Sequence, residues 1–239
     1  MSKWTSDDDK YVLYMDIMGF KERVKSTDFS VLQEQFNELC SKLKNRISPL
    51  TTGEHLVYYQ FSDSIVLTTD EATPKGLNLI IRAGATIMQE SMKVKFPING
   101  AIAKGKFSCD TEKNIFFGQA LVDAYLLQST LFYYGLAVHP NVDVDIKKFM
   151  SRPIEQYKKT SKLLFPIPIP LKGGSASYYN INWNLLGANN DIKDTTREAQ
   201  RLLNDLEKGT TIGNPRIYIE NTRQIIDNVK SIFDELLQK

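Results

Sequence analysis

Two aspartates lie in matching settings, each inside a short β-rich apolar run. Asp16 lies in the run at 11–20 (YVLYMDIMGF), and Asp63 lies in the run at 58–67 (YYQFSDSIVL). Burying a carboxylate costs free energy unless the group is paired or binds a metal. Two such acids indicate oxygen ligands for hard divalent cations, which most often serve phosphate groups. From spacing alone, the alternative that each aspartate only marks the turn after its strand stays open.

Size and composition favour one soluble globular unit. A chain of 239 residues can bury one substantial core, or one domain with an appendage. The net charge of +2 gives no overall field that would indicate a nucleic-acid or membrane partner. No apolar stretch reaches transmembrane length, and the first ten residues are too polar for a signal peptide. We therefore expect a cytoplasmic protein with no nucleic-acid or membrane partner.

Cysteine and histidine are scarce, which excludes several kinds of site. The two cysteines, Cys40 and Cys109, are far apart in sequence and fit reduced thiols better than a disulfide framework. The two histidines, His55 and His139, are too few for a zinc site built on several histidines. A Ser-His-Asp or Cys-His triad would need one of these two.

Hydrophobic periodicity predicts alternating short strands and amphipathic helices in the first half of the chain. The predicted elements are a strand at 11–17, a helix at 29–47, strands at 55–61 and 64–69, a helix at 75–93 and a strand at 97–104. The apolar face of the helix at 75–93 consists of Leu77, Ile80, Ile81, Gly84 and Met88. This βαββαβ order predicts a ferredoxin-like α/β (α+β) fold.

The second half of the chain adds further elements to this core. They are a short strand at 115–117, a helix at 120–134, a strand at 136–139, a helix at 144–150 and a strand at 178–183. Alternating prolines at 166, 168 and 170 predict an edge strand or an extended arm. Two charged helices at 191–208 and 215–238 follow, separated by a turn at 209–213. We therefore divide the chain into a domain over 1–183 and a C-terminal helical extension over 184–239, which packs on the domain or on a second subunit.

Five segments follow one another in an order that resembles a known enzyme family. They are MDIMGF at 15–20, FSDSI at 61–65, INGAIAKG at 98–105, FFGQALVDAYLL at 116–127, and PLKGG at 170–174 with YYNINW at 178–183. The chain resembles the class III nucleotidyl cyclases, and most closely the stand-alone bacterial pyrimidine cyclases of the Pycsar anti-phage systems. The resemblance covers residues 11 to about 183.

The first two segments carry the catalytic roles that the resemblance implies. The carboxylates of Asp16 and Asp63, with the backbone carbonyl of Ile17, would hold two Mn²⁺ or Mg²⁺ ions. Gly19 lets the turn at 18–20 approach an anion closely, so that its N–H groups bind phosphates. Phe20 would anchor this turn in the core. The ions would activate the ribose 3′-hydroxyl and hold the triphosphate, giving a 3′,5′-cyclic nucleotide and pyrophosphate.

The chain departs from the pattern of related cyclases at three positions. Asn99 stands where related cyclases often carry Arg. Val122 and Leu126 stand where adenylate and guanylate cyclases carry an Asn and an Arg that steady the ribose and the transition state. The absence of this Asn and Arg argues against an ordinary adenylate or guanylate cyclase. It leaves open a loss of activity, or another residue in the same role.

Two further residues are predicted to bind the substrate. Lys172, on a glycine-flanked hairpin tip, would reach the terminal phosphates, and a solvated turn lysine is the alternative. Tyr59 lies four residues before Asp63, where purine cyclases read the base. A tyrosine there narrows the pocket, stacks on a base and offers one hydroxyl, which favours UTP or CTP. The alternative is that Tyr59 is simply one of the aromatic residues stacked on the sheet.

The sequence therefore predicts a homodimeric cyclase with its two active sites at the subunit interface. The acids would come from one subunit, and Lys172 and residues of the helix at 120–134 from the other. The product would be cUMP or cCMP, a signal in anti-phage defence. The alternatives are a catalytically silent cyclase-like module that binds a nucleotide or a protein, a polymerase-like palm that makes oligonucleotides, and a purine cyclase with an altered pocket. Near-neutral charge speaks against a long nucleic-acid substrate.

Overall fold

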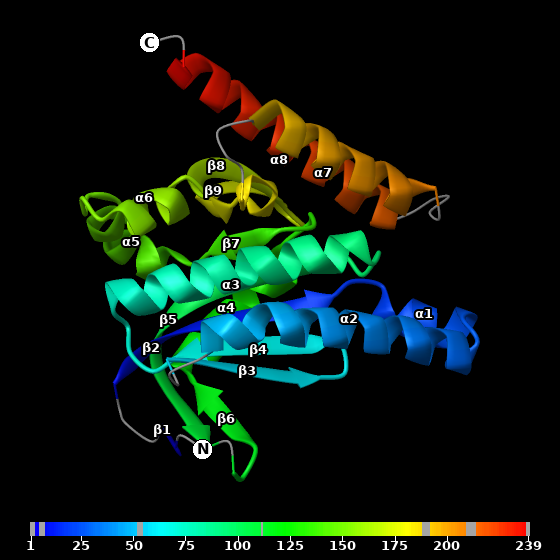
Figure 1. Cartoon of the computed structure of the whole chain (residues 1–239), viewed down its shortest axis with the longest axis horizontal. Coiled ribbons are helices and arrows are strands. Elements are labelled where there is room, and N and C mark those ends of the chain that lie inside the picture. The colour runs from blue at the N-terminus through cyan, green and yellow to red at the C-terminus, as the bar shows by residue number, and fades with distance from the viewer. Residues whose placement is uncertain are drawn as a thin grey trace.

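A computed structural model of the chain describes residues 3–4, 8–51, 55–110, 112–187, 192–208 and 214–237 (Figure 1). Its centre is a mixed sheet in the order β3-β4-β2-β5-β7-β9-β8, with β1 and β6 both paired to β5. The pair β5–β7 is parallel, and the other described pairs are antiparallel. The strands are β1 Lys3–Trp4, β2 Asp9–Ile17, β3 Leu56–Phe61, β4 Ser64–Thr69, β5 Ile98–Asp110, β6 Ile115–Gly118, β7 Leu136–Val138, β8 Leu164–Leu171 and β9 Gly174–Ile181.

Helices cover both faces of this sheet. The helices α2 and α3 pack together over one face, and α4 lies on the opposite face against β2 and β5 (Figure 1). The α-helices are α1 Phe20–Ser26, α2 Phe29–Thr51, α3 Pro74–Lys93, α4 Gln119–Thr130, α5 Asp143–Met150, α6 Glu155–Ser161, α7 Ile192–Glu207 and α8 Asn214–Leu237. The elements β2, α2, β3, β4, α3 and β5 reproduce the predicted βαββαβ order.

The strand β2 shows how the sequence pattern sets the two faces. Its odd-numbered residues Tyr11 to Ile17 are buried in the main core with α2 and α3. Val12 belongs instead to a second buried cluster with Ala120 of α4. Because side chains alternate along a strand, Tyr14 and Asp16 share the α4 face with Val12.

Local signals also define α3. Pro74 occupies its first turn, and the Thr73 hydroxyl caps it by accepting a hydrogen bond from the Gly76 amide at 3.2 Å. The predicted apolar face is confirmed, because all five of its residues are buried.

Several predicted boundaries were wrong. The helix predicted at 120–134 ends at Thr130, because Leu131 instead forms a bridge with Leu171 of β8. The final strand starts at Gly174, earlier than predicted. The short helices α1 and α6 were missed, and α1 buries no side chain that would have produced an apolar pattern. The alternating prolines lie in β8 at the edge of the sheet, as one of the two readings predicted.

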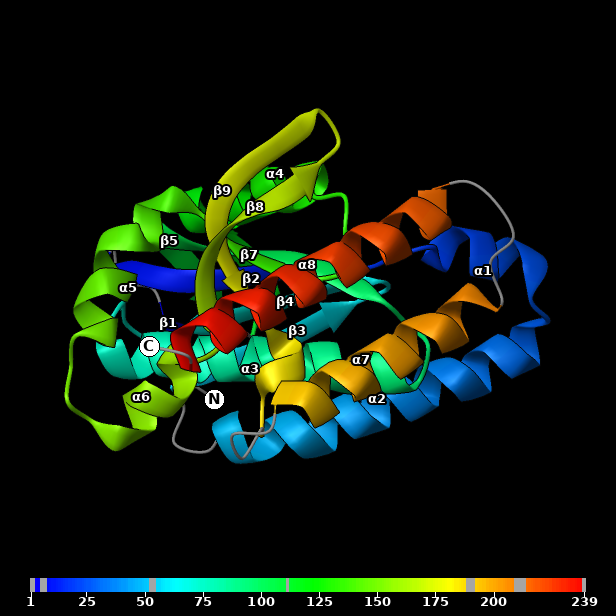
Figure 2. The same ribbon diagram turned by 90° about the horizontal axis from the view of Figure 1, so that it is seen from above.

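The helices α7 and α8 pack side by side above the β8–β9 end of the sheet (Figures 1 and 2). Phe233 of α8 contacts Phe165 of β8, with ring centroids 4.9 Å apart. The predicted turn at 209–213 lies outside the described residues, and the division of the chain at 183/184 stays a prediction. None of the described helices combines the length and apolar character that crossing a membrane requires.

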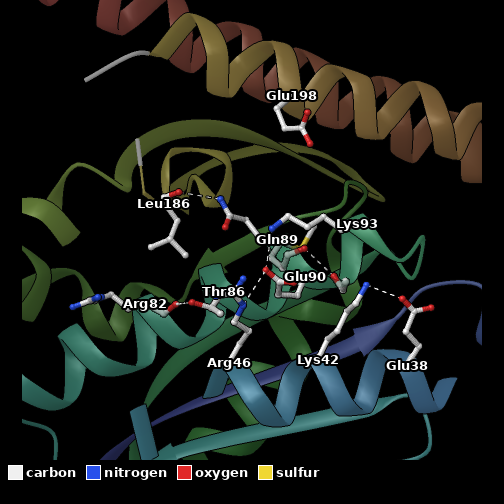
Figure 3. A network of polar contacts seen from close by, with 12 residues as sticks. Glu38, Lys42, Arg46, Arg82, Thr86, Gln89, Glu90, Lys93, Leu186 and Glu198 are labelled. Carbon is white, nitrogen blue, oxygen red and sulfur yellow. Dashed lines mark hydrogen bonds and ion pairs between the residues drawn. The ribbon is translucent and has the colours of Figure 1, made fainter. Parts of the chain in front are cut away.

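Polar contacts tie α2, α3 and the start of the C-terminal helices together (Figure 3). Glu90 of α3 accepts a hydrogen bond from Lys93 at 2.9 Å and lies 3.6 Å from Arg46 of α2. Gln89 donates to the Leu186 carbonyl at 3.1 Å, just before α7. The pKa of Glu198 in α7 is lowered mainly by its hydrogen bond with Arg201, and Lys93 also contributes.

Candidate active site

The two predicted acids meet at one end of the sheet. Asp16, near the end of β2, pairs with Ser64 of β4 on one side and with Asn99 of β5 on the other. Asp63 lies in the two-residue loop between β3 and β4, and its carbonyl accepts a hydrogen bond from the Ile17 amide at 2.9 Å. The hairpin tip is thereby attached to the end of β2. Both carboxylates are partly accessible to solvent.

The pKa of Asp16 reflects its proximity to Asp63. This pKa is raised to about 6, mainly by burial and also by the negative charge of Asp63, and the positive charge of Lys172 partly offsets the rise. The three side chains are thus close enough to interact within a single chain. A carboxylate that is both desolvated and repelled by a neighbour is stabilised when a cation binds between the two.

A titration of the metal-free protein tests this arrangement. Asp16 is expected to titrate near pH 6, and carboxyl ¹³C NMR in the presence of a chelator measures that pKa directly. Asp63→Asn removes a repelling charge, so the pKa of Asp16 should fall. Lys172→Ala removes an attracting charge, so it should rise. An Asp16 that titrates near pH 4 in the unmodified protein would contradict this geometry.

The donor set fits a hard divalent cation. Asp16 and Asp63 supply carboxylate oxygens, and the described residues contain no group of three or more His, Cys, Asp or Glu side chains that could hold a metal. An ion held here would therefore depend on backbone carbonyls, water or a substrate to complete its coordination. Mg²⁺ commonly binds in this way, through one or two carboxylates plus substrate phosphates.

The turn after Asp16 requires a glycine for its backbone conformation. Gly19 has φ +74°, in the left-handed region, and a Cβ built there meets nothing within 4 Å. The Met18 amide donates to the Pro97 carbonyl at 2.8 Å, which attaches the turn to the sheet. Phe20 packs on Phe36 with ring centroids 5.1 Å apart, consistent with its predicted role as an anchor. Phosphate binding by this turn stays a prediction.

Sequence reasoning missed a cluster of hydroxyl groups beside the acids. The Tyr14 hydroxyl lies 2.9 Å from the Ser64 hydroxyl, and Tyr125 of α4 packs edge-on against Tyr14 at 5.4 Å. Burial is the main cause of a raised pKa at Tyr14, and Asp16 and Asp63 contribute to it. The two-residue period of the strand could have revealed Tyr14, because it places this residue on the same face as Asp16.

Tyr59 lies on this same face of the sheet. It pairs with Val66, which pairs in turn with Tyr14, so the three side chains share one face. Its ring packs on Phe116 of β6 at 4.5 Å. This contact agrees with the alternative of a sheet aromatic, and it leaves the predicted contact with a base to experiment.

The three positions that depart from related cyclases differ in their burial. Asn99 is buried and accepts a hydrogen bond from the amide of Gln128 in α4 at 2.8 Å. It therefore links β5 to α4 beside Asp16. Val122 and Leu126, by contrast, lie on the outer side of α4 and are 49% and 55% exposed.

Lys172 lies at the tip of the β8–β9 hairpin, which projects over the C-terminal end of α4 (Figure 2). Its amide donates to the Thr130 carbonyl at 2.8 Å, and its side chain is exposed. The predicted homodimer places Lys172 and the acids of one site on different subunits. In the single chain, however, the lysine already influences Asp16.

An apolar surface borders the site. It consists of Phe61 at the end of β3 and of Val122, Tyr125 and Leu126 on α4, all of which are exposed. Tyr125 contacts Tyr14, and Phe61 pairs with Ser64 beside Asp16, so the surface adjoins the acid pair. We call these four residues the α4 surface. Exposed apolar side chains gathered around a site often mark an interaction surface.

Comparison with known proteins identifies the fold. No protein-family model and no curated protein matches the chain. Solved structures do match. The monomeric guanylyl cyclase domain of the RhoGC fusion protein from the aquatic fungus Blastocladiella emersonii is 13% identical, with a TM-score of 0.52, and the match covers 75% of this chain and 98% of that domain. The non-canonical dimeric form of that domain matches with the same identity and TM-score, over 75% of this chain and 97% of that one. The chain therefore has the fold of a class III cyclase catalytic domain.

Proposed function

We propose that this protein is a nucleotidyl cyclase that converts a pyrimidine nucleoside triphosphate, UTP or CTP, to the 3′,5′-cyclic monophosphate and pyrophosphate. The observation that carries the proposal is the meeting of Asp16 and Asp63 at the end of β2, in a fold shared with guanylyl cyclase domains. Asp16, Asp63 and the Ile17 carbonyl would hold two Mn²⁺ or Mg²⁺ ions. When bound, these ions lower the pKa of the ribose 3′-hydroxyl and neutralise the phosphates.

The residues of the chain position the nucleotide. The turn at Gly19 and Phe20 supplies backbone N–H groups to the phosphates, and Lys172 places a flexible positive charge on the terminal ones. The 3′-oxygen then bonds to the α-phosphorus, the bond to pyrophosphate breaks, and the hydroxyl proton leaves to solvent. Negative charge builds up on the pyrophosphate as it leaves, and the ammonium group of Lys172 stabilises that charge.

Pyrimidine selectivity is the finer part of the proposal. Tyr59 takes the base-reading position, and its ring packs on Phe116 on the same face of the sheet as Asp16. The purine-cyclase Asn and Arg have no counterpart at Val122 and Leu126. The role in anti-phage defence, with cUMP or cCMP as the signal, rests on the sequence resemblance.

We further propose a homodimer that uses the α4 surface. Packing two copies on this surface would cover its four exposed apolar side chains and close the acid pair from solvent. Cyclase domains of this fold include a dimeric form.

Incubation of the purified protein with each of the four nucleoside triphosphates and Mn²⁺ tests the activity. We expect a cyclic mononucleotide from UTP or CTP, identified by mass spectrometry, and an equal amount of pyrophosphate. Product from ATP or GTP alone would overturn the pyrimidine assignment, and linear or cyclic oligomers would indicate a polymerase-like enzyme.

The second candidate is a catalytically silent nucleotide-binding module. The exposure of Val122 and Leu126, where active purine cyclases carry polar groups, favours it. Binding of a nucleotide without release of pyrophosphate, in a folded protein supplied with Mn²⁺ or Mg²⁺, would support this candidate over the enzyme.

A further inference from the structure

Residues 131–134, within the segment that joins α4 to β7, contact the C-terminal helix on one side and the hairpin that carries Lys172 on another. We call these residues the linker. Side chains of α8 make three hydrogen bonds to its backbone. The Tyr218 hydroxyl donates to the Leu131 carbonyl at 3.2 Å, Asn221 donates to the Phe132 carbonyl at 2.6 Å, and the Tyr134 amide donates to Thr222 at 2.8 Å.

Aromatic packing reinforces these bonds. The Tyr218 ring packs edge-on against Phe132 at 4.8 Å and stacks on Tyr134 at 5.3 Å. Tyr218 and Thr222 are both buried, so their polar groups must find partners within the protein. The sheet holds the other side of the linker, where the Tyr133 hydroxyl donates to Asn180 at 2.8 Å.

The linker and the last residue of α4 in turn hold the hairpin tip that carries Lys172. The Phe132 amide donates to the Pro170 carbonyl at 3.0 Å, and the Lys172 amide donates to the Thr130 carbonyl at 2.8 Å. Leu131 and Leu171 form a bridge between these two bonds. The β8–β9 ladder ends at the pair Leu171–Gly174, which leaves Lys172 and Gly173 as the turn, and a Cβ built at either glycine meets nothing within 4 Å. Besides the hairpin's own ladder, the position of Lys172 therefore depends on bonds to a segment that α8 holds.

We propose that α8 acts as a brace that positions Lys172 over the acid pair, with Asn221 as the positioning residue that links the helix to the linker. This inference rests on the proposed function only for the role of Lys172 in binding a triphosphate. The brace itself is a property of the fold. Burial is the main cause of the raised pKa of Tyr218, and the charge of Asp16 contributes to it.

Asn221→Asp gives the sharpest test. Aspartate has the shape of asparagine but no N–H donor, so an oxygen would face the Phe132 carbonyl and repel it. The matched control is Asn228→Asp, which makes the same charge change at an exposed position of the same helix. Asn221→Ala serves as a milder second variant if Asn221→Asp fails to fold.

Amide hydrogen exchange tests the brace without any need for activity. In Asn221→Asp we expect exchange at the Phe132 and Lys172 amides to rise about tenfold, because the bonds they donate open more often. Exchange in β2 should not change, and Asn228→Asp should match the unmodified protein. Unchanged exchange at both amides would overturn the inference, whether or not the protein is an enzyme.

Kinetics then test the consequence for Lys172. We expect Asn221→Asp to raise the KM for the nucleotide about fivefold with kcat within twofold, since a displaced lysine weakens triphosphate binding. In a Lys172→Ala background the same change should have no further effect on KM, because the group it positions is gone. Independent, multiplicative effects would overturn the link to Lys172. If the unmodified protein makes no product, the proposed function fails, and hydrogen exchange alone decides on the brace.

Discussion

Asp63→Asn is expected to reduce cyclic nucleotide formation by about a thousandfold or more, with Asp16→Asn equally severe. Each change removes the negative charge that a divalent cation needs while it keeps the shape of the side chain. The fold should survive, because Asp63 holds β2 through its backbone carbonyl, which the substitution leaves in place. Relief of the repulsion that Asp63 exerts on the desolvated Asp16 should leave stability unchanged or improved.

The measurement is the initial rate of pyrophosphate release with Mn²⁺ and with Mg²⁺, alongside thermal unfolding of each variant. Asp70→Asn is the matched control, because Asp70 follows β4 at its other end and its carboxylate contacts His55 instead of the site. It should retain nearly full activity. Turnover left intact in either Asp16→Asn or Asp63→Asn would rule out the proposed catalytic site.

Leu126→Glu is expected to convert a dimer to a monomer and to lower activity by more than about tenfold. Leu126 is 55% exposed on the α4 surface, so a single chain tolerates a charge there. In a dimer the same charge would be buried without a partner, at a cost of several kcal/mol. Loss of the dimer would then open the acid pair to solvent.

Sedimentation velocity over a range of protein concentrations measures the dimer, and the rate assay is run on the same samples. Val144→Glu is the control, because Val144 is also an exposed apolar residue but lies on α5, outside the α4 surface. An unmodified protein that is active as a monomer, or a Leu126→Glu variant that remains an active dimer, would exclude the proposed interface.

The local sequence was sufficient to predict the order of the core elements and the acid pair. The strands and the helix α3 follow from apolar periodicity and capping, which depend on residues within a few positions of one another. The hairpin containing Asp63 is also local, since β3 and β4 are joined by a two-residue loop. Its pairing with β2, which brings Asp63 to Asp16, followed from the expected order of strands in the fold.

Other features depended on contacts between distant segments, and local patterns could not reveal them. The helix α4 stops at Thr130 because Leu131 bridges to Leu171, forty residues later in the chain. The hydrogen bond between Asn99 and Gln128, and the packing of Tyr14 on Tyr125, likewise join a strand to a helix that follows much later. The residues next to each of these side chains in the sequence do not predict the contact that it makes.

The sequence by itself thus determined which residues are candidate metal ligands, because a carboxylate within an apolar strand is chemically unusual wherever the strand lies. Only the tertiary structure decided what surrounds them. It placed Lys172 of the same chain near Asp16 and set α8 against the linker at 131–134. The reason is physical: periodicity reports which face of an element is buried, whereas the partner on that face is chosen by packing across the whole chain.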